Sequence, residues 1–98
     1  MSSFNETVDL QSFQAAVGSV GTSAAQLATV LSGKPAYKGV TIKNTHASNN
    51  LFVGKSDVTA TTGFELGPDE SIELVIKQPS ELYVIASGAS TTYTWLAY

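Results

Sequence analysis

The residue types that could carry out catalysis or bind a metal are few in this sequence, and they are scattered. His46 is the only histidine, and none of the 98 residues is a cysteine. A general base needs partners within hydrogen-bond reach, and zinc generally takes three or four protein ligands. One histidine without cysteine supplies neither arrangement. The sequence therefore predicts that His46 is a turn or surface residue and that the chain binds no cofactor or metal.

Paired carboxylates are the next candidates. Asp69 and Glu70 are adjacent in an expected turn, so their side chains should diverge. Glu65 and Glu73 could flank one hairpin, but glycoside hydrolysis needs two carboxyl groups roughly 5–10 Å apart across a cleft, and a domain of this size has little room for one. The loop around Asp57, GKSDVTATTG, lacks the alternating oxygen donors of a dedicated calcium site. We expect solvent-exposed carboxylates and a protein that is not an enzyme.

The charge of the chain bears on its partners. It has five lysines, no arginine and eight acidic residues, for a formal net charge of −3. Nucleic-acid binding needs clustered Lys and Arg to displace counterions from phosphates, and the five lysines are dispersed. No segment approaches the roughly 20 apolar residues that span a bilayer, and the N-terminus lacks the pattern of a secretory signal. We expect neither a nucleic acid nor a membrane as a partner, and synthesis in a cytoplasm.

The length of the chain makes its stability marginal. Ninety-eight residues form one domain, and such a domain buries only about 60–65% of the surface its unfolded chain exposes. Without cysteine, no disulfide can add stability. Association with further subunits is the expected compensation, because it buries area that a small core lacks. We therefore expect a homo-oligomer.

The elements that must position these residues are strands. In SIELVI (71–76), Ile72, Leu74 and Ile76 share one face, as they do in a half-buried strand. Comparable segments recur about every ten residues and are separated by Gly, Pro, Asn and Ser, which is typical of an all-β fold. We predict a small antiparallel β-sandwich or jelly-roll-like barrel over residues 13–98. Its expected strands are 13–20, 38–46, 51–55, 64–66, 71–76, 82–87 and 91–98.

Turn-forming residues join these strands. In GPDE, Pro68 has the φ angle required at the second position of a tight turn. GAS (88–90) has the length of a three-residue hairpin turn. LYVIAS (82–87) is apolar on both faces, as expected of a central strand covered on both sides. The residues from 64 to 76 are therefore predicted to build a sheet edge and a hairpin.

One segment, TSAAQLATVL (22–31), fits two periodicities. Ala24, Leu27 and Leu31 lie at helical spacing, whereas Leu27, Thr29 and Leu31 would share one face of a strand. The periodicity alone leaves helix and strand open.

Residues 1–12 are polar and non-periodic and are predicted to form an extended N-terminal arm. Phe4, Val8 and Leu10 are its isolated apolar residues. Chain termini of this kind commonly fray. The alternative is an arm that docks these three side chains on a neighbouring molecule, which makes them candidate interface residues.

Aromatic side chains also have two possible roles. Core packing is the expected one, since large rings dominate the burial of small domains. Tyr93 and Trp95 share one face of the last strand, and Tyr98 is the final residue. An exposed aromatic row could instead bind sugars or another subunit, and Tyr98 is the ring best placed to face a partner. Tyr93, Trp95 and Tyr98 complete the set of candidate interface residues.

With the strands laid out, the chain from Thr22 to Tyr98 resembles small accessory structural proteins of tailed bacteriophages. Their recurring run is a VYVG-like strand, a V-T loop and G-F-x-L-x-P-G-E-S-x-x-L. Asp69 stands where this run usually has Gly, and we expect it to suit a type I turn. The matching residues are Val53, Gly54, Val58, Thr59, Gly63, Phe64, Leu66, Pro68, Glu70, Ser71 and Leu74.

The resemblance implies a β-module of a phage virion, and it favours a strand over a helix for residues 22–31. The leading hypothesis is a capsid decoration, or cement, protein that binds across subunits of the major capsid protein and assembles as a homo-oligomer, with a trimer expected. Residues 1–12 match nothing in that class, so their role as an anchor to the capsid is inferred from their composition. The alternative is a carbohydrate- or receptor-binding module of a head or tail fibre, with Tyr93 and Trp95 as its platform.

Overall fold

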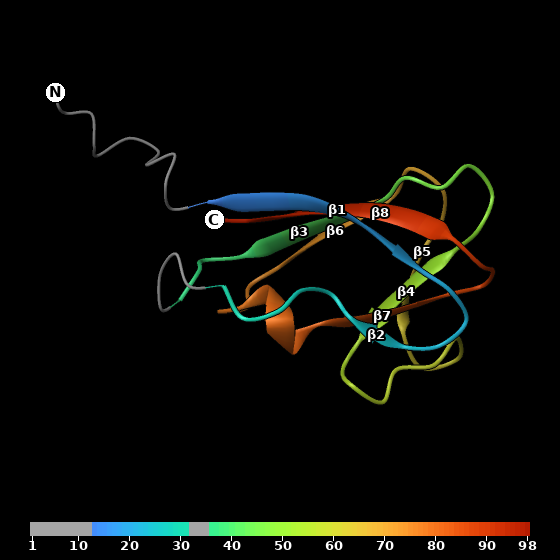
Figure 1. Ribbon diagram of the computed structural model, residues 1–98, viewed down its shortest axis with the longest axis horizontal. Helices are drawn as coiled ribbons and strands as arrows, with labels where there is room; N and C mark the ends of the chain where they lie inside the picture. The colour runs from blue at the N-terminus through green and yellow to red at the C-terminus, as the bar shows by residue number, and fades with distance from the viewer. Residues whose placement is uncertain (1–12, 32–35) are drawn as a thin grey trace, which may run out of the picture.

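The computed structural model describes residues 13–31 and 36–98, which fold into two antiparallel four-stranded sheets packed face to face (Figure 1). The predicted all-β sandwich is confirmed. The first sheet has the strand order β1-β8-β3-β6, and the second has the order β2-β7-β4-β5. The strands are β1 (Gln14–Val20), β2 (Ala25–Gln26), β3 (Val40–Asn44), β4 (Leu51–Gly54), β5 (Phe64–Leu66), β6 (Ser71–Leu74), β7 (Tyr83–Ala86) and β8 (Thr91–Ala97).

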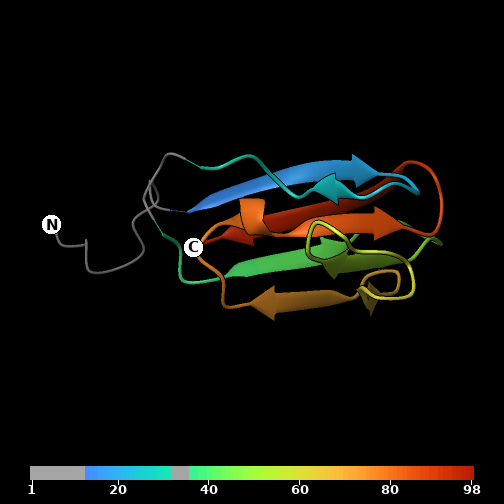
Figure 2. The same cartoon turned by 90° about the horizontal axis from the view of Figure 1, so that it is seen from below.

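The pairing of the strands describes a rolled ribbon. β1 pairs with β8, β2 with β7, β3 with β6 and β4 with β5, all antiparallel. Two further pairings, β3 with β8 and β4 with β7, close the roll. This arrangement is the order of an eight-stranded jelly roll, in which every connection except the one between β4 and β5 crosses from one sheet to the other. Figure 2 shows the first sheet with β1 at one edge and β6 at the other.

The hairpins predicted around GPDE and GAS are wrong, because the strands on either side of each turn belong to different sheets. β5 and β6 lie in different sheets, as do β7 and β8, so the turns between them carry the chain across the sandwich. The prediction of a sheet edge is confirmed, because β5 and β6 each form one. β7 is central, between β2 and β4, but only its inward residues Val84 and Ala86 are buried, whereas Tyr83 and Ile85 are half-buried.

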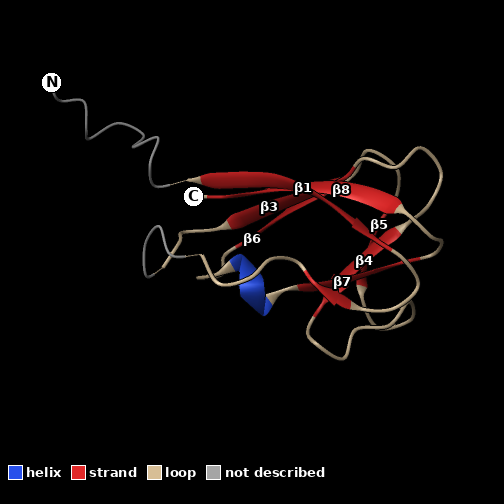
Figure 3. Ribbon diagram, viewed as in Figure 1, coloured by secondary structure: helices blue, strands red, loops and turns tan. Residues whose placement is uncertain are grey.

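Residues 22–31 contain no α-helix. Only Ala25–Gln26 forms a strand, β2, and the rest is irregular. The one helical turn among the described residues is the 3-10 helix η1 (Pro79–Glu81) (Figure 3). The amide of Leu27 donates to the carbonyl oxygen of Leu82, so contacts to the segment after η1 hold this region extended. Long-range pairing thus overrides the local helical spacing.

The core forms between the two inward faces. Val40 and Ile42 on β3 face Val84 on β7 and Leu51 on β4, and all four are fully buried. Each such side chain contributes about 1.5–3 kcal/mol to folding relative to an exposed one. The alternation of buried and exposed residues along β3 and β8 therefore follows from which side of the sheet meets the core.

A buried amide links the two sheets at one end of the core. Asn44 is fully buried, and its Nδ2 donates to the carbonyl oxygens of Asn49 and Leu66, each at 2.9 Å. Its Oδ1 accepts from the amide of His46 at 2.9 Å. Two carbonyl acceptors and one amide donor fix the orientation of the side chain, and every polar atom of this buried group is satisfied.

The turn at Asp69 differs from the predicted type. The amide of Glu70 donates to the carbonyl oxygen of Gly67 at 3.0 Å, which closes the turn around Pro68. Asp69, at its third position, has φ of 66°. A type I turn needs about −90° there and a type II turn about +80°, so the expectation of a type I turn is wrong. A non-glycine residue therefore occupies a left-handed position that favours Gly.

Candidate interaction surfaces

His46 has a structural role in a turn. Its Nδ1 accepts from the amides of Ser48 at 3.1 Å and Asn49 at 2.9 Å. The ring thus closes the turn between β3 and β4. This agrees with the expectation of a turn residue.

Two carboxylates, one in strand β5 and one in the turn before β6, accept hydrogen bonds. Oε1 of Glu70 accepts from the amide of Gly67 at 2.6 Å, and Oε2 of Glu65 accepts from Nδ2 of Asn50 at 2.7 Å. Within residues 13–31 and 36–98, no group of three or more His, Cys, Asp or Glu side chains is placed to hold a metal ion. The hydrogen bond at Glu70 stabilises the backbone of the turn around Pro68, whereas the one at Glu65 joins two exposed side chains.

The predicted exposed platform of Tyr93 and Trp95 is wrong, because both side chains are buried. Tyr93 is 4% exposed and Trp95 is 7% exposed, because both occupy inward positions of β8 and belong to the core. Burial raises the pKa of the Tyr93 phenol above its usual value of 10.0. The default role, core packing, is the one that these two rings have. Neither forms the exposed aromatic row that the alternative role requires.

Of the other candidate interface residues, the structure describes only Tyr98. Phe4, Val8 and Leu10 lie outside the described residues. Tyr98 is half-buried, and its backbone extends the sheet, since its amide donates to the carbonyl oxygen of Gly39 at 3.1 Å. Its role at an interface stays a prediction.

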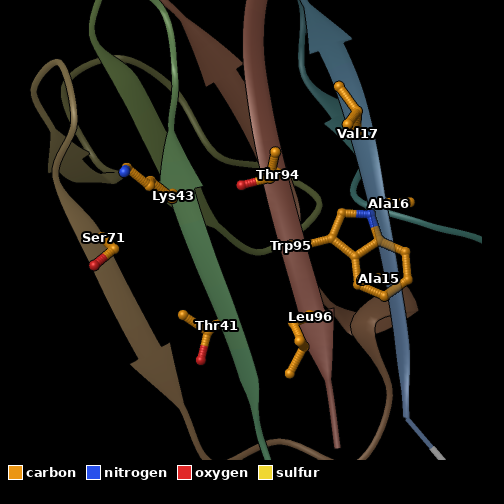
Figure 4. Close-up of a pocket in the computed structure, with 9 residues that line it drawn as sticks. All are labelled: Ala15, Ala16, Val17, Thr41, Lys43, Ser71, Thr94, Trp95 and Leu96. Atoms are coloured by element: carbon orange, nitrogen blue, oxygen red, sulfur yellow. The ribbon is translucent and has the colours of Figure 1, made fainter. Parts of the chain in front are cut away.

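The outer face of the first sheet carries exposed apolar side chains. Strand register places Ala15 and Val17 beside Leu96 and Thr94, with Thr41 across the next strand. Val17 is 75% exposed and Leu96 is 37% exposed. A shallow depression of about 530 Å³ lies here, shown in Figure 4, and is lined by Ala15, Ala16, Val17, Thr41, Lys43, Ser71, Thr94, Trp95 and Leu96.

The outer face of the second sheet is covered by the chain itself. Phe52 points outward from β4 yet is only 8% exposed, and Val58 in the loop between β4 and β5 is 5% exposed. A Cβ at Gly63 would lie 2.8 Å from Cβ of Phe52 and closely approach Val58, so this loop lies directly on β4. The loop therefore covers the second sheet at Phe52, whereas Val17 on the outer face of the first sheet is exposed.

The edge strand β1 adds to the open surface. It has seven residues, QAAVGSV, with no charge and no proline. Among the described strands it pairs only with β8. Long uncharged edge strands are uncommon in monomers, because their unpaired backbone groups invite another chain. Val17 belongs both to this edge strand and to the lining of the depression, so the two form one surface.

A second hollow lies between the sheets at the opposite edge. We call it the side groove: a volume of about 410 Å³ between β5 and β6, with an apolar wall and one charge of each sign at its rim. It forms because β5 and β6 are short edge strands of different sheets. The lining residues are Val53, Gly54, Lys55, Phe64, Ile72, Leu74, Ile76, Glu81 and Leu82.

Sequence reasoning missed both surfaces. The period-two pattern of β8 predicts that Thr94 and Leu96 face away from Tyr93 and Trp95, but not which face is inside. The groove depends on β5 and β6 lying in different sheets, which no local pattern encodes.

The comparisons with known proteins are negative: no family model, no curated protein and no solved structure matches this chain. Among the described residues, no helix has the length and apolar character that crossing a membrane requires.

Proposed function

We propose that this protein is a non-enzymatic adhesive module, and specifically a capsid decoration, or cement, protein of a tailed bacteriophage virion. The observation that supports adhesion is the exposed outer face of the first sheet, where Val17 and Leu96 flank a depression, while a loop covers Phe52 on the outer face of the second sheet. The phage context rests on the resemblance of residues 22–98 to accessory virion proteins.

The mechanism is surface burial. Seating Val17 and Leu96 against a capsid subunit removes apolar area from water, which contributes about 25 cal/mol per Å². The neighbouring Thr41 and Thr94 offer hydroxyl groups for hydrogen bonds at the rim of such a contact. The interface of one copy is modest, but many copies on a shell multiply it, so expansion of the shell must break all of them.

The partners in this proposal are the major capsid protein and further copies of the same chain. A homo-oligomer, with a trimer expected, places several outer faces on one shell and converts weak contacts into avidity. The uncharged edge of β1 supports association, since no like charges oppose it.

The test is binding of the purified chain to capsids that lack it. Val17→Asp places a charge on the outer face and should weaken capsid binding at least tenfold, whereas Val30→Asp, at a valine that is 71% exposed elsewhere, should not. Equal binding by both variants, or absence of the chain from the shell in cryo-electron microscopy of the parent virion, would refute the proposal.

The carbohydrate-binding alternative loses its expected platform. It depended on Tyr93 and Trp95 as an exposed row, and both are buried.

A further inference from the structure

The side groove has the features of a site for an extended peptide. Six apolar side chains form its wall, and three of them, Ile72, Leu74 and Ile76, are half-buried rather than sealed in the core. Phe64 at its rim is 58% exposed. Its volume of about 410 Å³ lies in the usual range for binding pockets, about 300–1,000 Å³.

The strands beside the groove can also offer backbone partners. Among the described strands, β5 pairs only with β4, and β6 only with β3. Each therefore has N–H and C=O groups directed away from its sheet, and such edges accept an added strand. Pockets for alternate side chains then supply specificity.

The N-terminal sequence has the matching pattern. Phe4, Val8 and Leu10 fall on positions of the same parity, so an extended backbone places them on one side, with Glu6 between the first two. Lys55 is the cation at the rim of the groove. An apolar row interrupted by one carboxylate thus complements the apolar wall, with Lys55 rather than Glu81 as the charged group at the rim that Glu6 would meet.

We propose that residues 4–10 of one copy lie extended in the side groove of a second copy, with Phe4, Val8 and Leu10 against its apolar wall and Glu6 near Lys55. This inference deepens the proposed homo-oligomer by naming its contact. It does not depend on capsid binding.

The length of chain favours a second copy over the same one. Strand register aligns Gln14 on β1 with Leu74 on β6, across three strand spacings or about 14 Å. Leu10 precedes Gln14 by four residues, which span at most about 14 Å when fully extended. These four residues would be used up in crossing the sheet, so Leu10 could not also turn around the end of the sheet into the groove of the same copy. Head-to-tail exchange between copies has no such limit, and it closes into a ring such as a trimer when the rotation permits.

The first test measures molar mass by light scattering on the full chain over a range of concentrations. Ile76→Ser should raise the dissociation constant of the oligomer about tenfold or more, as should the pair Phe4→Ser and Leu10→Ser. Val75→Ser is the matched control: Val75 is adjacent to Ile76 but is 94% exposed on the other side, so its removal should leave the mass unchanged. A wild-type monomer, or an oligomer unaffected by Ile76→Ser, would overturn the inference while leaving capsid binding to be judged separately.

A charge swap covers the case in which Ile76→Ser fails to fold. Lys55 is exposed, so Lys55→Glu should fold normally and weaken association about threefold. Combining it with Glu6→Lys should restore association, and failure to restore it contradicts the placement of Glu6.

Cross-linking distinguishes the two geometries directly, since the chain has no cysteine of its own. Val8→Cys with Ile76→Cys should form an intermolecular disulfide on oxidation, whereas Val8→Cys with Val75→Cys should not. A disulfide within one chain, or equal cross-linking of both pairs, would overturn the exchange.

Discussion

Gly18 on β1 and Tyr93 on β8 are cross-strand partners, and the phenol ring of Tyr93 occupies the space that a side chain at Gly18 would need. A Cβ at Gly18 would lie 2.7 Å from Cε1 of Tyr93 and closer still to Cζ. The ring can lie against β1 only because position 18 has no Cβ. This contact keeps Tyr93 buried at 4% exposure and couples the edge strand β1 to the core.

Gly18→Ala should therefore destabilise the fold by about 1–3 kcal/mol, because the ring of Tyr93 or the backbone of β1 must shift. Urea unfolding followed by tryptophan fluorescence measures the change. Gly21→Ala is the control, since a Cβ there would meet only Cα of Ala89 at 3.9 Å, an ordinary contact. An equal effect of both substitutions would contradict the close approach.

The buried phenol of Tyr93 also predicts a dependence on alkaline pH. Burial raises its pKa above 10.0 in the folded state, so the unfolded chain releases this proton first. The contribution to stability is fully present below pH 10 and is lost as pH rises through the folded pKa, by at most about 1.4 kcal/mol per pH unit. Urea unfolding between pH 8 and about 11.5 should show this decline, and Tyr93→Phe should make it shallower. Parallel curves for the two proteins would show that another group causes it.

Asn44 should be among the most sensitive polar residues. Asn44→Leu leaves the carbonyl oxygens of Leu66 and Asn49 without their donor, at a cost of about 3 kcal/mol. Asn44→Asp should be worse at neutral pH, because a buried carboxylate would face two carbonyl oxygens, and it should recover in part in acid when the carboxyl group can donate. Thermal unfolding at two pH values checks both variants.

The control for Asn44 is Asn50→Ala, which removes an exposed hydrogen bond to Glu65 and should cost less than about 1 kcal/mol. A similar loss at both positions would show that burial of the Asn44 amide is not the cause.

Asp69→Gly should stabilise the protein by about 0.5–1 kcal/mol. Asp69 holds φ of 66°, which Gly adopts without steric cost. Asp69→Ala should have the opposite sign, since Ala has the same Cβ and lacks the short polar side chain that helps Asp tolerate this conformation. Melting temperatures of the two variants test the pair. A destabilised Gly variant would imply that the Asp side chain makes a larger contribution than the backbone strain.

Much of this fold follows from local patterns. Ile72, Leu74 and Ile76 alternate because one side of their segment meets the core, and the strand predicted over 71–76 is β6, which ends at Leu74. Pro68 predicts a turn, which the hydrogen bond from Glu70 to Gly67 closes. The type of that turn was not predictable, because Asp tolerates more than one φ value and the surrounding strands select it.

Local patterns alone predict that the chain is β, where most of its strands lie and that His46 belongs to a turn, because these features depend on residue periodicity and backbone propensity over a few positions. Which strands are partners follows from the three-dimensional fold and not from these local patterns. The rolled pairing puts β5 and β6 in different sheets, opens the groove beside Ile76, turns Tyr93 inward and leaves Val17 bare. The physical reason is that burial is a property of two surfaces that meet, and one strand does not specify which surface it will meet.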